Sequence, residues 1–253
     1  MSYLKELGAL SRLQRIKSNK LLNISSEEFA ASNLQIQNKD DEIVPFIYNR
    51  AQRHFINSIK EHYAAGRRFH LLIKARQLGF STAIVGWLFE EICKRSIRGA
   101  IMAHDADTTA KLRRMVKIFY DFLPDGFPLE RLRDNAAITS FLPHNSEITI
   151  GTAGGDRKTK AGAKKGGKGR GGTYNFFHGS EVAFWPNPEL IIAGALQGLS
   201  KNGLCIFETT TNGAQGWVWK TVQKPGKWII HFYPWWWGED YTIDVISTIM
   251  EMA

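Results

Sequence analysis

Residues 71–82, with the sequence LLIKARQLGFST, decide how the rest of the chain is interpreted. The apolar run 69–73 leads into a short polar turn that contains Gly79, and two hydroxyl residues, Ser81 and Thr82, follow it. The next residues, AIVGWLFEEICKR, have the composition of a helix. Strand, glycine turn, hydroxyl and helix is the order of a phosphate-binding loop. In such a loop, backbone N–H groups and a helix N-terminus face the anion and a hydroxyl reaches Mg²⁺.

This loop departs from the pattern G-x-x-x-x-G-K-[ST]. If Gly79 is the second glycine, Lys74 stands at the position of the first one. Phe80 stands where the lysine is expected, and Ser81 keeps the hydroxyl position. Phosphate binding still requires a cation, which Lys74 and Arg76 would supply from the other end of the loop. Taken alone, the stretch is equally compatible with an ordinary strand, turn and helix whose charges are solvated.

Composition limits the class of protein. The chain has 253 residues, enough for one large α/β domain or two small ones, and 43% of them are hydrophobic, which excludes a disordered protein. The formal net charge of +9 favours a polyanionic partner, nucleic acid first. Cys93 and Cys205 are too few for a disulfide framework or a metal-ligand cluster, which fits a reducing cytoplasm.

Targeting signals are not expected from the N-terminus. Its first residues, MSYLKELGALSRLQR, contain no continuous apolar core and no small-residue cleavage site, so we predict no signal peptide. No apolar run is long enough to cross a bilayer, so we predict no membrane association through a span.

The hydrophobic pattern alternates between strands and helices. Strands are expected at residues 69–73, 99–104, 136–141, 147–152, 174–178, 203–209 and 228–233, and helices at 49–65, 81–95, 105–122, 188–199 and 214–222. This alternation predicts an α/β fold with a mostly parallel sheet and helices on both faces. Residues 1–43 are expected to form an N-terminal helical arm or subdomain, with Ser25 and Glu28 as a capping box, although a floppy leader is equally compatible.

One segment, residues 154–172, is of low complexity. Its sequence, GGDRKTKAGAKKGGKGRGG, has eight glycines, seven Lys or Arg residues and one Asp. Such a run cannot bury a core, and its charge favours a phosphate backbone over the alternative of a solvated loop without a partner. The lysines predicted to contact DNA are Lys158, Lys160, Lys164, Lys165 and Lys168.

Polar residues follow two further predicted strands. Glu181 comes after the strand at 174–178, and residues 209–212, with the sequence TTTN, come after the strand at 203–209. In a nucleotide hydrolase, a carboxylate after one strand orients or deprotonates the attacking water, and a polar group after another senses the phosphate. Glu181 by itself would more simply be a residue at a helix start. The three features together favour the nucleotide site.

The segments KARQLGFST, FFHGSEVAFWP and FETTTNG, in this order and spacing, resemble the ATPase domain of the large terminase subunit of tailed bacteriophages. That protein is a DNA-packaging motor. The resemblance covers roughly residues 44–241, and the SEVAFWP stretch is its most specific part. It implies a P-loop NTPase fold of the ASCE/RecA-like type, with ATP and Mg²⁺ as cofactors.

The resemblance also implies roles for individual residues. The ATP-binding set would be Gln52, Lys74, Ala75, Arg76, Gln77, Leu78, Gly79, Phe80, Ser81 and Thr82, with Gln52 on the adenine. Glu181 would be the catalytic glutamate, Arg76 would act on the γ-phosphate in cis, and Arg170 would reach a neighbouring subunit's site. Thr209, Thr210, Thr211 and Asn212 would couple hydrolysis to movement. Ser81 and Ser180 would be the residues nearest the metal.

Two departures from the family stand out. Ser180 occupies the position of the Walker B aspartate, and a hydroxyl cannot hold a hydrated Mg²⁺ as a carboxylate would. His178 and Gly179 before it are poor strand formers. After Tyr241 only TIDVISTIMEMA remains, which leaves no room for the family's nuclease domain. We therefore expect an ATPase domain at residues 44–233, the start of a linker at 234–253, and no nuclease activity.

The function implied by the resemblance is ATP-driven movement of double-stranded DNA into a procapsid. The implied partners are DNA, the portal protein of the procapsid, the small terminase subunit and further copies of the chain in a ring, in the host cytoplasm. Two alternatives stay open. One is a DNA-stimulated, helicase-like translocase, and the other is a DNA-binding assembly module that has lost hydrolysis.

Overall fold

The computed structural model describes residues 23–135, 137–153 and 173–239. Its main sheet has eight strands in the order β10-β3-β9-β8-β4-β7-β6-β5. The strands from β10 to β7 are parallel, and β6 and β5 are antiparallel additions at one edge. Their bounds are β3 (Phe69–Lys74), β4 (Arg98–Ala103), β5 (Glu130–Asp134), β6 (Ile138–Leu142), β7 (Ser146–Thr152), β8 (Tyr174–Ser180), β9 (Leu199–Thr209) and β10 (Ile229–Tyr233).

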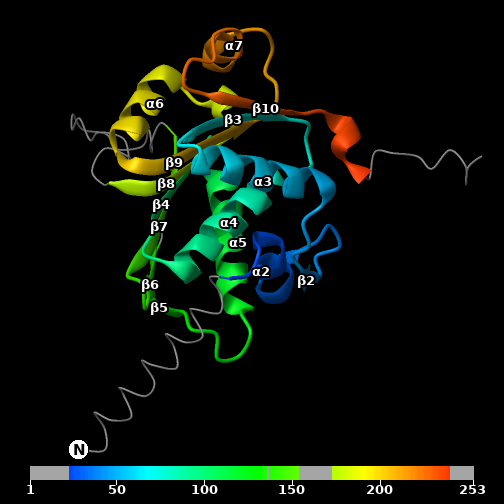
Figure 1. Ribbon diagram of the computed structural model, residues 1–253, viewed down its shortest axis with the longest axis vertical. Helices are drawn as coiled ribbons and strands as arrows, with labels where there is room; N and C mark the ends of the chain where they lie inside the picture. The colour runs from blue at the N-terminus through cyan, green and yellow to red at the C-terminus, as the bar shows by residue number, and fades with distance from the viewer. Residues whose placement is uncertain (1–22, 136, 154–172, 240–253) are drawn as a thin grey trace, which may run out of the picture.

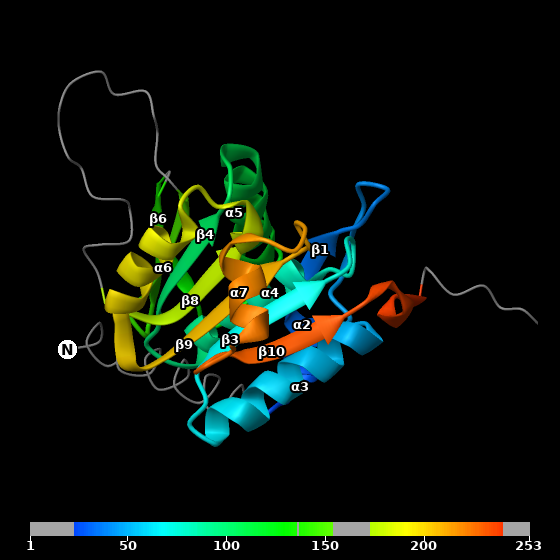
Figure 2. The same ribbon diagram turned by 90° about the horizontal axis from the view of Figure 1, so that it is seen from above.

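Helices cover both faces of this sheet (Figures 1 and 2). On one face lie α2 (Ser26–Asn33), α3 (Arg50–Ala64), α4 (Phe80–Lys94) and α5 (Ala106–Asp121). On the other lie α6 (Pro188–Gln197), α7 (Gly216–Gln223) and the short helix η1 (Val182–Phe184). The predicted fold class, a mostly parallel α/β sheet between two helical layers, is confirmed.

Alternation along the central strands produces two separate cores. Leu72 of β3 and Ile206 of β9 pack in the core beneath α3, α4 and α5. Leu71, Cys205 and Phe207 pack in the core beneath α6 and α7. Because both faces of these parallel strands are buried, their sequences are continuous apolar runs, and a polar residue inside one of them requires a partner.

The predicted helix starts are observed at three places. Ser25 caps α2 in a capping box with Glu28, Asn49 caps α3, and Asp105 accepts a hydrogen bond from the backbone N–H of Thr108 at the start of α5. Such caps satisfy backbone donors that a helix leaves unpaired.

The N-terminal region contacts the main body. Phe29 and Leu34, from α2 and its end, are fully buried in the same core as α4. A small two-stranded sheet, β1 (Gln35–Gln37) and β2 (Ile43–Pro45), follows α2. The predicted segments at residues 1–22 and 240–253 lie outside the described residues, and the proposed boundary at residue 43 stays a prediction.

Three strands illustrate where the structure departs from the sequence-based expectation. β5 (Glu130–Asp134) was not predicted, because it is an exposed edge strand without an apolar alternation. β9 begins at Leu199, four residues earlier than expected. β8 extends to Ser180, two residues beyond the expected end at His178, and it includes both His178 and Gly179 although they were expected to be poor strand formers. Gly179 fits there because a Cβ would lie 2.6 Å from the ring of Phe207.

Candidate nucleotide site

The site begins at the loop between β3 and α4. Lys74 ends β3, and Phe80 is the first residue of α4. Gln77 and Gly79 both have left-handed backbone conformations, with φ of 60° and 68°. The loop thereby turns directly into the N-terminus of α4, and the unpaired backbone N–H groups at the start of a helix suit an anion.

Gln52 of α3 holds this loop from behind. Its side-chain Nε2 donates to the carbonyl oxygens of Gly79 at 2.9 Å and Leu78 at 3.3 Å. Its Oε1 accepts from the backbone N–H of Asn49, whose Nδ2 also donates to the carbonyl of Leu78 at 3.2 Å. Gln52 is buried, so these contacts fix the loop backbone; its predicted contact with adenine stays a prediction.

Lys74 lies between two carboxylates. Its Nζ is 3.0 Å from Oε1 of Glu181, at the end of β8, and 3.1 Å from Oε2 of Glu208, in β9. Burial alone would lower the pKa of Lys74. The charges of Glu208 and Glu181 outweigh burial and hold the pKa of the ammonium above its usual value. Lys74 is therefore a cation in the folded protein.

Glu208 is the most deeply placed charge of the site, with no exposed surface. Its Oε1 accepts hydrogen bonds from the hydroxyls of Ser81, at the start of α4, and Ser180, at 2.9 Å. Nε2 of His178 lies 3.4 Å from the same oxygen. Burial alone would raise the pKa of Glu208, but Lys74, with His178 and the Ser81 hydroxyl, holds it well below its usual range.

Glu181 is fixed by the end of β9. Its Oε2 accepts from the backbone N–H of Thr210 at 2.9 Å and from the Thr210 hydroxyl at 3.2 Å. The hydroxyl of Thr209 lies 3.4 Å from the same oxygen. Glu181 itself has a left-handed backbone, with φ of 53°, which is uncommon for a residue with a side chain. Strain at such a position is typical of functional sites.

The structure brings most of the predicted site residues together. Lys74, Gly79, Ser81, Ser180, Glu181, Thr209 and Thr210 line one edge of the sheet, at the carboxyl ends of β3, β9 and β8. Leu78 and Phe80 are buried beneath the loop, and Arg76 and Gln77 are exposed on it. Ala75 donates its backbone N–H to the carbonyl of Tyr233. Thr82 is half-buried in the first turn of α4.

The outer part of the coupling segment is more exposed. Thr211 and Asn212 are exposed, and Nδ2 of Asn212 donates to the carbonyl of Ala183 in η1 at 3.3 Å. Arg170 and the predicted DNA-binding lysines at 158, 160, 164, 165 and 168 lie outside the described residues, so their roles stay predictions.

Glu208 is the site residue that sequence analysis did not single out. The signal was present: a lone carboxylate between Phe207 and Thr209 closes an apolar strand that is buried on both faces. A charge in such a place is almost always paired or bound to a metal. Its partners could not be identified in advance, because Lys74, Ser81 and Ser180 are far from it in sequence.

The side chains fit a nucleotide bound with Mg²⁺. Within the described ranges, no group of three or more His, Cys, Asp or Glu side chains is placed to hold a metal by itself. Mg²⁺ at nucleotide sites, however, takes its ligands from phosphates, water and a few protein oxygens. The Ser81 hydroxyl beside the ionised Glu208 supplies such oxygens, and Lys74 with the α4 amides matches a phosphate chain.

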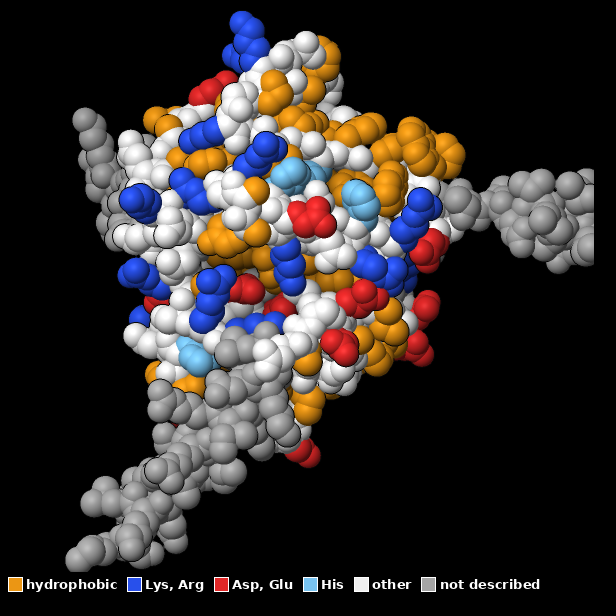
Figure 3. All heavy atoms as spheres, viewed as in Figure 1, with side chains coloured by type: hydrophobic (Ala, Val, Ile, Leu, Met, Phe, Trp, Pro, Cys, Tyr) orange, Lys and Arg blue, Asp and Glu red, His pale blue; other side chains and the backbone are white. Residues whose placement is uncertain are grey.

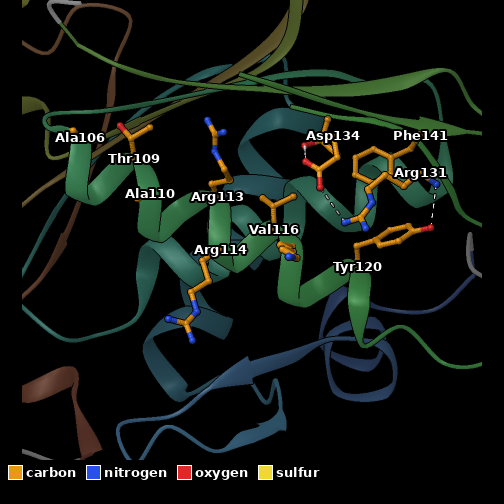
Figure 4. A pocket seen from close by; sticks show the side chains of 12 residues that line it. Ala106, Thr109, Ala110, Arg113, Arg114, Val116, Tyr120, Arg131, Asp134 and Phe141 are labelled. Carbon is orange, nitrogen blue, oxygen red and sulfur yellow. Dashed lines mark hydrogen bonds and ion pairs between the residues drawn. The ribbon is translucent and has the colours of Figure 1, made fainter. Parts of the chain in front are cut away.

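A hollow in the structure contains none of the site residues described so far. It has a volume of about 540 Å³ between α5 and the β5–β6 hairpin, and arginines line it (Figure 4). Arg131 there is paired with Asp121 and Asp134, both at 3.3 Å, and lies over the ring of Tyr120. These two ion pairs offset the charge of Arg131, while Arg113, Arg114 and Lys117 also line the hollow.

Together, the strand order, the loop between β3 and α4 and the carboxylates at the ends of β8 and β9 define the α/β fold of P-loop NTPases. Solved structures with the same fold are large terminases of bacteriophages. The large terminase of bacteriophage HK97 matches with a TM-score of 0.62 at 15% identity, over 88% of this chain and 46% of its own. The resemblance inferred from sequence is thus confirmed at the level of the fold.

Two further solved structures of large terminases are similar to this chain. The large terminase of the thermophilic bacteriophage D6E, solved in complex with ATP-γ-S, matches with a TM-score of 0.55 at 10% identity, over 81% of this chain and 49% of its own. The large terminase ATPase domain of Thermus phage P74-26 matches with a TM-score of 0.51 at 17% identity, over 72% of this chain and 79% of its own. The chain spans about half the length of the HK97 and D6E proteins. No protein-family model and no curated protein matches the chain by sequence.

Proposed function

We propose that the chain is an ATP hydrolase of the large-terminase type, in which hydrolysis drives double-stranded DNA into a procapsid. The observation that carries the proposal is the placement of Glu181. One of its oxygens is held by the backbone N–H of Thr210, and the other faces the ammonium of Lys74 at the phosphate loop. This is the relation between a water-orienting carboxylate and a phosphate loop that hydrolysis requires.

The roles of the other residues follow from this arrangement. Lys74 and the first backbone N–H groups of α4 would bind the phosphates, and the Ser81 hydroxyl would be the protein's ligand to Mg²⁺. When bound, Mg²⁺ neutralises phosphate charge and orients the nucleotide. Arg76 of the exposed loop would stabilise charge on the γ-phosphate, and Arg170 would do so from a neighbouring subunit.

Thr209 and Thr210 link Glu181 to the segment that leads into α7. Because they hold the carboxylate directly, a change in its hydrogen bonding would displace the segment at residues 210–215. We propose this displacement as the coupling step, with Thr211 and Asn212 as its outer part. The D6E structure in complex with ATP-γ-S supports the choice of ATP as the nucleotide.

DNA, the portal protein, the small terminase subunit and a ring of copies would be the partners, in the host cytoplasm. On the face drawn in Figure 3, the described Lys and Arg side chains are interspersed with Asp and Glu. We therefore assign DNA binding first to the basic segment at residues 154–172. None of the helices described is both long and apolar enough to cross a membrane.

Phosphate release from Mg-ATP, with and without double-stranded DNA, tests the proposal. We expect turnover by the wild-type chain and a loss of about 10²–10⁴-fold for Glu181→Gln, with nucleotide binding retained. A loss of less than tenfold would remove Glu181 from its role. Glu189→Gln, at an exposed glutamate of α6, is the matched control.

Ser180 favours a second candidate, an assembly module that binds ATP without hydrolysing it. Tight nucleotide binding without turnover, even with portal and DNA present, would support that candidate. A helicase-like translocase would instead unwind DNA without any dependence on the portal.

A further inference from the structure

The sequence lacks a carboxylate where such sites usually have one. At the end of β8, next to Glu181, stands Ser180, which is fully buried. In P-loop hydrolases an aspartate there cooperates with the loop hydroxyl to hold Mg²⁺. A hydroxyl in its place is neutral and cannot balance the charge of the ion.

The neighbouring strand brings a carboxylate to the same place. β9 lies between β3 and β8, and Glu208 stands opposite Ser180 in the register of the two strands. Oε1 of Glu208 is 2.9 Å from the Ser180 hydroxyl and accepts a hydrogen bond from Ser81. The Glu208 carboxylate is therefore hydrogen-bonded to the end of the side chain at position 180. It also contacts the hydroxyl of Ser81 directly.

We propose that Glu208 is the carboxylate of the magnesium site, supplied from β9 in place of the missing aspartate of β8. The inference rests on the proposed function, because it requires Mg-ATP at the loop. Glu208 would orient Ser81 and accept hydrogen bonds from the hydrated ion. It is a positioning residue, since the Ser81 hydroxyl and the phosphates would contact the metal.

The pairing explains why residue 180 is a serine. An aspartate at 180 would place a second negative charge about 3 Å from Glu208 in a buried site, and two carboxylates at that distance cannot both stay ionised without a cation between them. A serine there instead donates a hydrogen bond to Glu208. The site thus keeps one carboxylate next to Ser81, at a different position in the chain.

The contacts of Lys74 agree with this assignment. Its ammonium lies 3.1 Å from Oε2 of Glu208, so a single cation already stands beside the carboxylate. With Mg-ATP at the loop, Glu208 would supply the negative charge beside the ion, and Lys74 would be available to pair with the phosphates. Ser81, Lys74 and Glu208 would then each keep a charged or hydrogen-bonding partner, as buried polar groups require.

The test is the Mg²⁺ dependence of nucleotide affinity, measured with ATP-γ-S by calorimetry in excess Mg²⁺ and in EDTA. For Glu208→Gln we expect the Mg²⁺-dependent gain in affinity to fall by about 10–100-fold, with affinity in EDTA within a few-fold of wild type. A purely structural role would weaken binding equally in both conditions. Glu189→Gln, at an exposed glutamate of α6 outside the site, is the control and should keep the full gain.

The outcomes separate this inference from the proposed function. A Glu208→Gln variant that keeps the gain overturns the assignment of Glu208 alone. A wild-type chain that binds no nucleotide in either condition overturns both. If Glu208→Gln does not fold, the same measurement is made on the exchange variant Ser180→Asp/Glu208→Ser. This variant moves the carboxylate from β9 back to β8. A retained gain supports the relocated carboxylate, and a lost gain with binding intact in EDTA contradicts it.

Discussion

Lys74 and Glu181 form an ion pair of 3.0 Å across the ends of β3 and β8, so the proposed phosphate-binding cation and the proposed water-orienting carboxylate are in direct contact. A triphosphate at the loop would compete with Glu181 for the ammonium. Nucleotide binding would then release one oxygen of Glu181, while Thr210 keeps hold of the other.

Replacement of Lys74 is expected to destabilise the protein as well as weaken nucleotide binding. Lys74→Met leaves Glu208 as a buried charge without its cation, and breaking such a pair costs about 3–5 kcal/mol. Chemical denaturation should show this loss in the free energy of unfolding. Lys74→Met/Glu208→Gln should recover a large part of it, because no unpaired charge is then buried. If the double variant is no more stable than Lys74→Met, the pair with Glu208 does not account for the loss.

Alanine at Gly79 is expected to destabilise the protein more than alanine at Gly213 does, because only Gly79 has a close neighbour. A Cβ at 79 would clash with Nε2 of Gln52, which would have to move away from its two hydrogen bonds to the loop. Gly213 has a similar φ of 73° but no neighbour within 4 Å. Both Gly→Ala changes cost about 1–2 kcal/mol of backbone strain. Gly79→Ala should cost roughly 1–2 kcal/mol more.

Thermal unfolding of the two alanine variants measures this difference directly. The double variant Gln52→Ala/Gly79→Ala removes the clash. Its loss of unfolding free energy should lie close to the sum of the losses in Gln52→Ala and in Gly213→Ala. Equal stability of Gly79→Ala and Gly213→Ala would mean that the amide of Gln52 moves aside without loss.

Acid should destabilise the protein through two buried histidines. His70 of β3 and His231 of β10 stack, with Nδ1 of one 3.0 Å from Nε2 of the other. Burial is the main cause that lowers the pKa of His70 to about 4 and that of His231 to about 3, and His62 adds to both shifts. Below pH 6.5 the unfolded chain therefore binds more protons than the folded one, and stability falls as pH falls.

The expected slope is roughly 1.4 kcal/mol per pH unit for each histidine between pH 6 and pH 4. Denaturant titrations across this range should show it. His231→Phe removes one titrating group and should make the slope shallower. An unchanged slope in His231→Phe would show that His231 does not contribute to this pH dependence.

The basic segment at residues 154–172 is expected to set the salt dependence of DNA binding. Each lysine that contacts a phosphate contributes about 0.9 to the slope of log affinity against log salt concentration. Replacement of Lys158, Lys160, Lys164, Lys165 and Lys168 by serine should weaken binding and flatten the slope. An unchanged slope would show that these lysines do not contact the DNA backbone. ATP affinity without DNA should be the same in both proteins.

The sequence predicted the fold well where burial is periodic. The central strands, the cap at Ser25 and the helix starts near Asn49 and Asp105 could be identified because apolar runs and capping residues act locally. The edge strand β5 could not, since its residues are mostly exposed and its pairing with β6 depends on tertiary structure. The start of β9 was missed because Lys201 and Asn202 are exposed in a strand that is otherwise buried toward its end.

The candidate site was predicted in part for the same reason. The residues of the loop and Glu181 stand next to glycines, hydroxyls and strand ends that are visible in the sequence. Glu208 acquires its meaning only from contacts with Ser81 and Ser180, which are 127 and 28 residues away. Glu208 stands beside Ser180 only because β9 is the neighbour of β8 in the sheet. The order of strands in a sheet cannot be read from a local sequence pattern.

The length of β9 is under a constraint that its composition does not reveal. Glu208 points toward α4 and Thr209 toward η1, because consecutive residues of a strand face opposite sides of the sheet. Deleting one residue between Leu204 and Phe207 would reverse every side chain before the deletion relative to those after it. Either the apolar residues of β9, or Glu208 and Thr209, would then face the opposite helical layer from the one they contact now. We therefore expect conservative substitutions in this strand to be tolerated far better than any change in its number of residues.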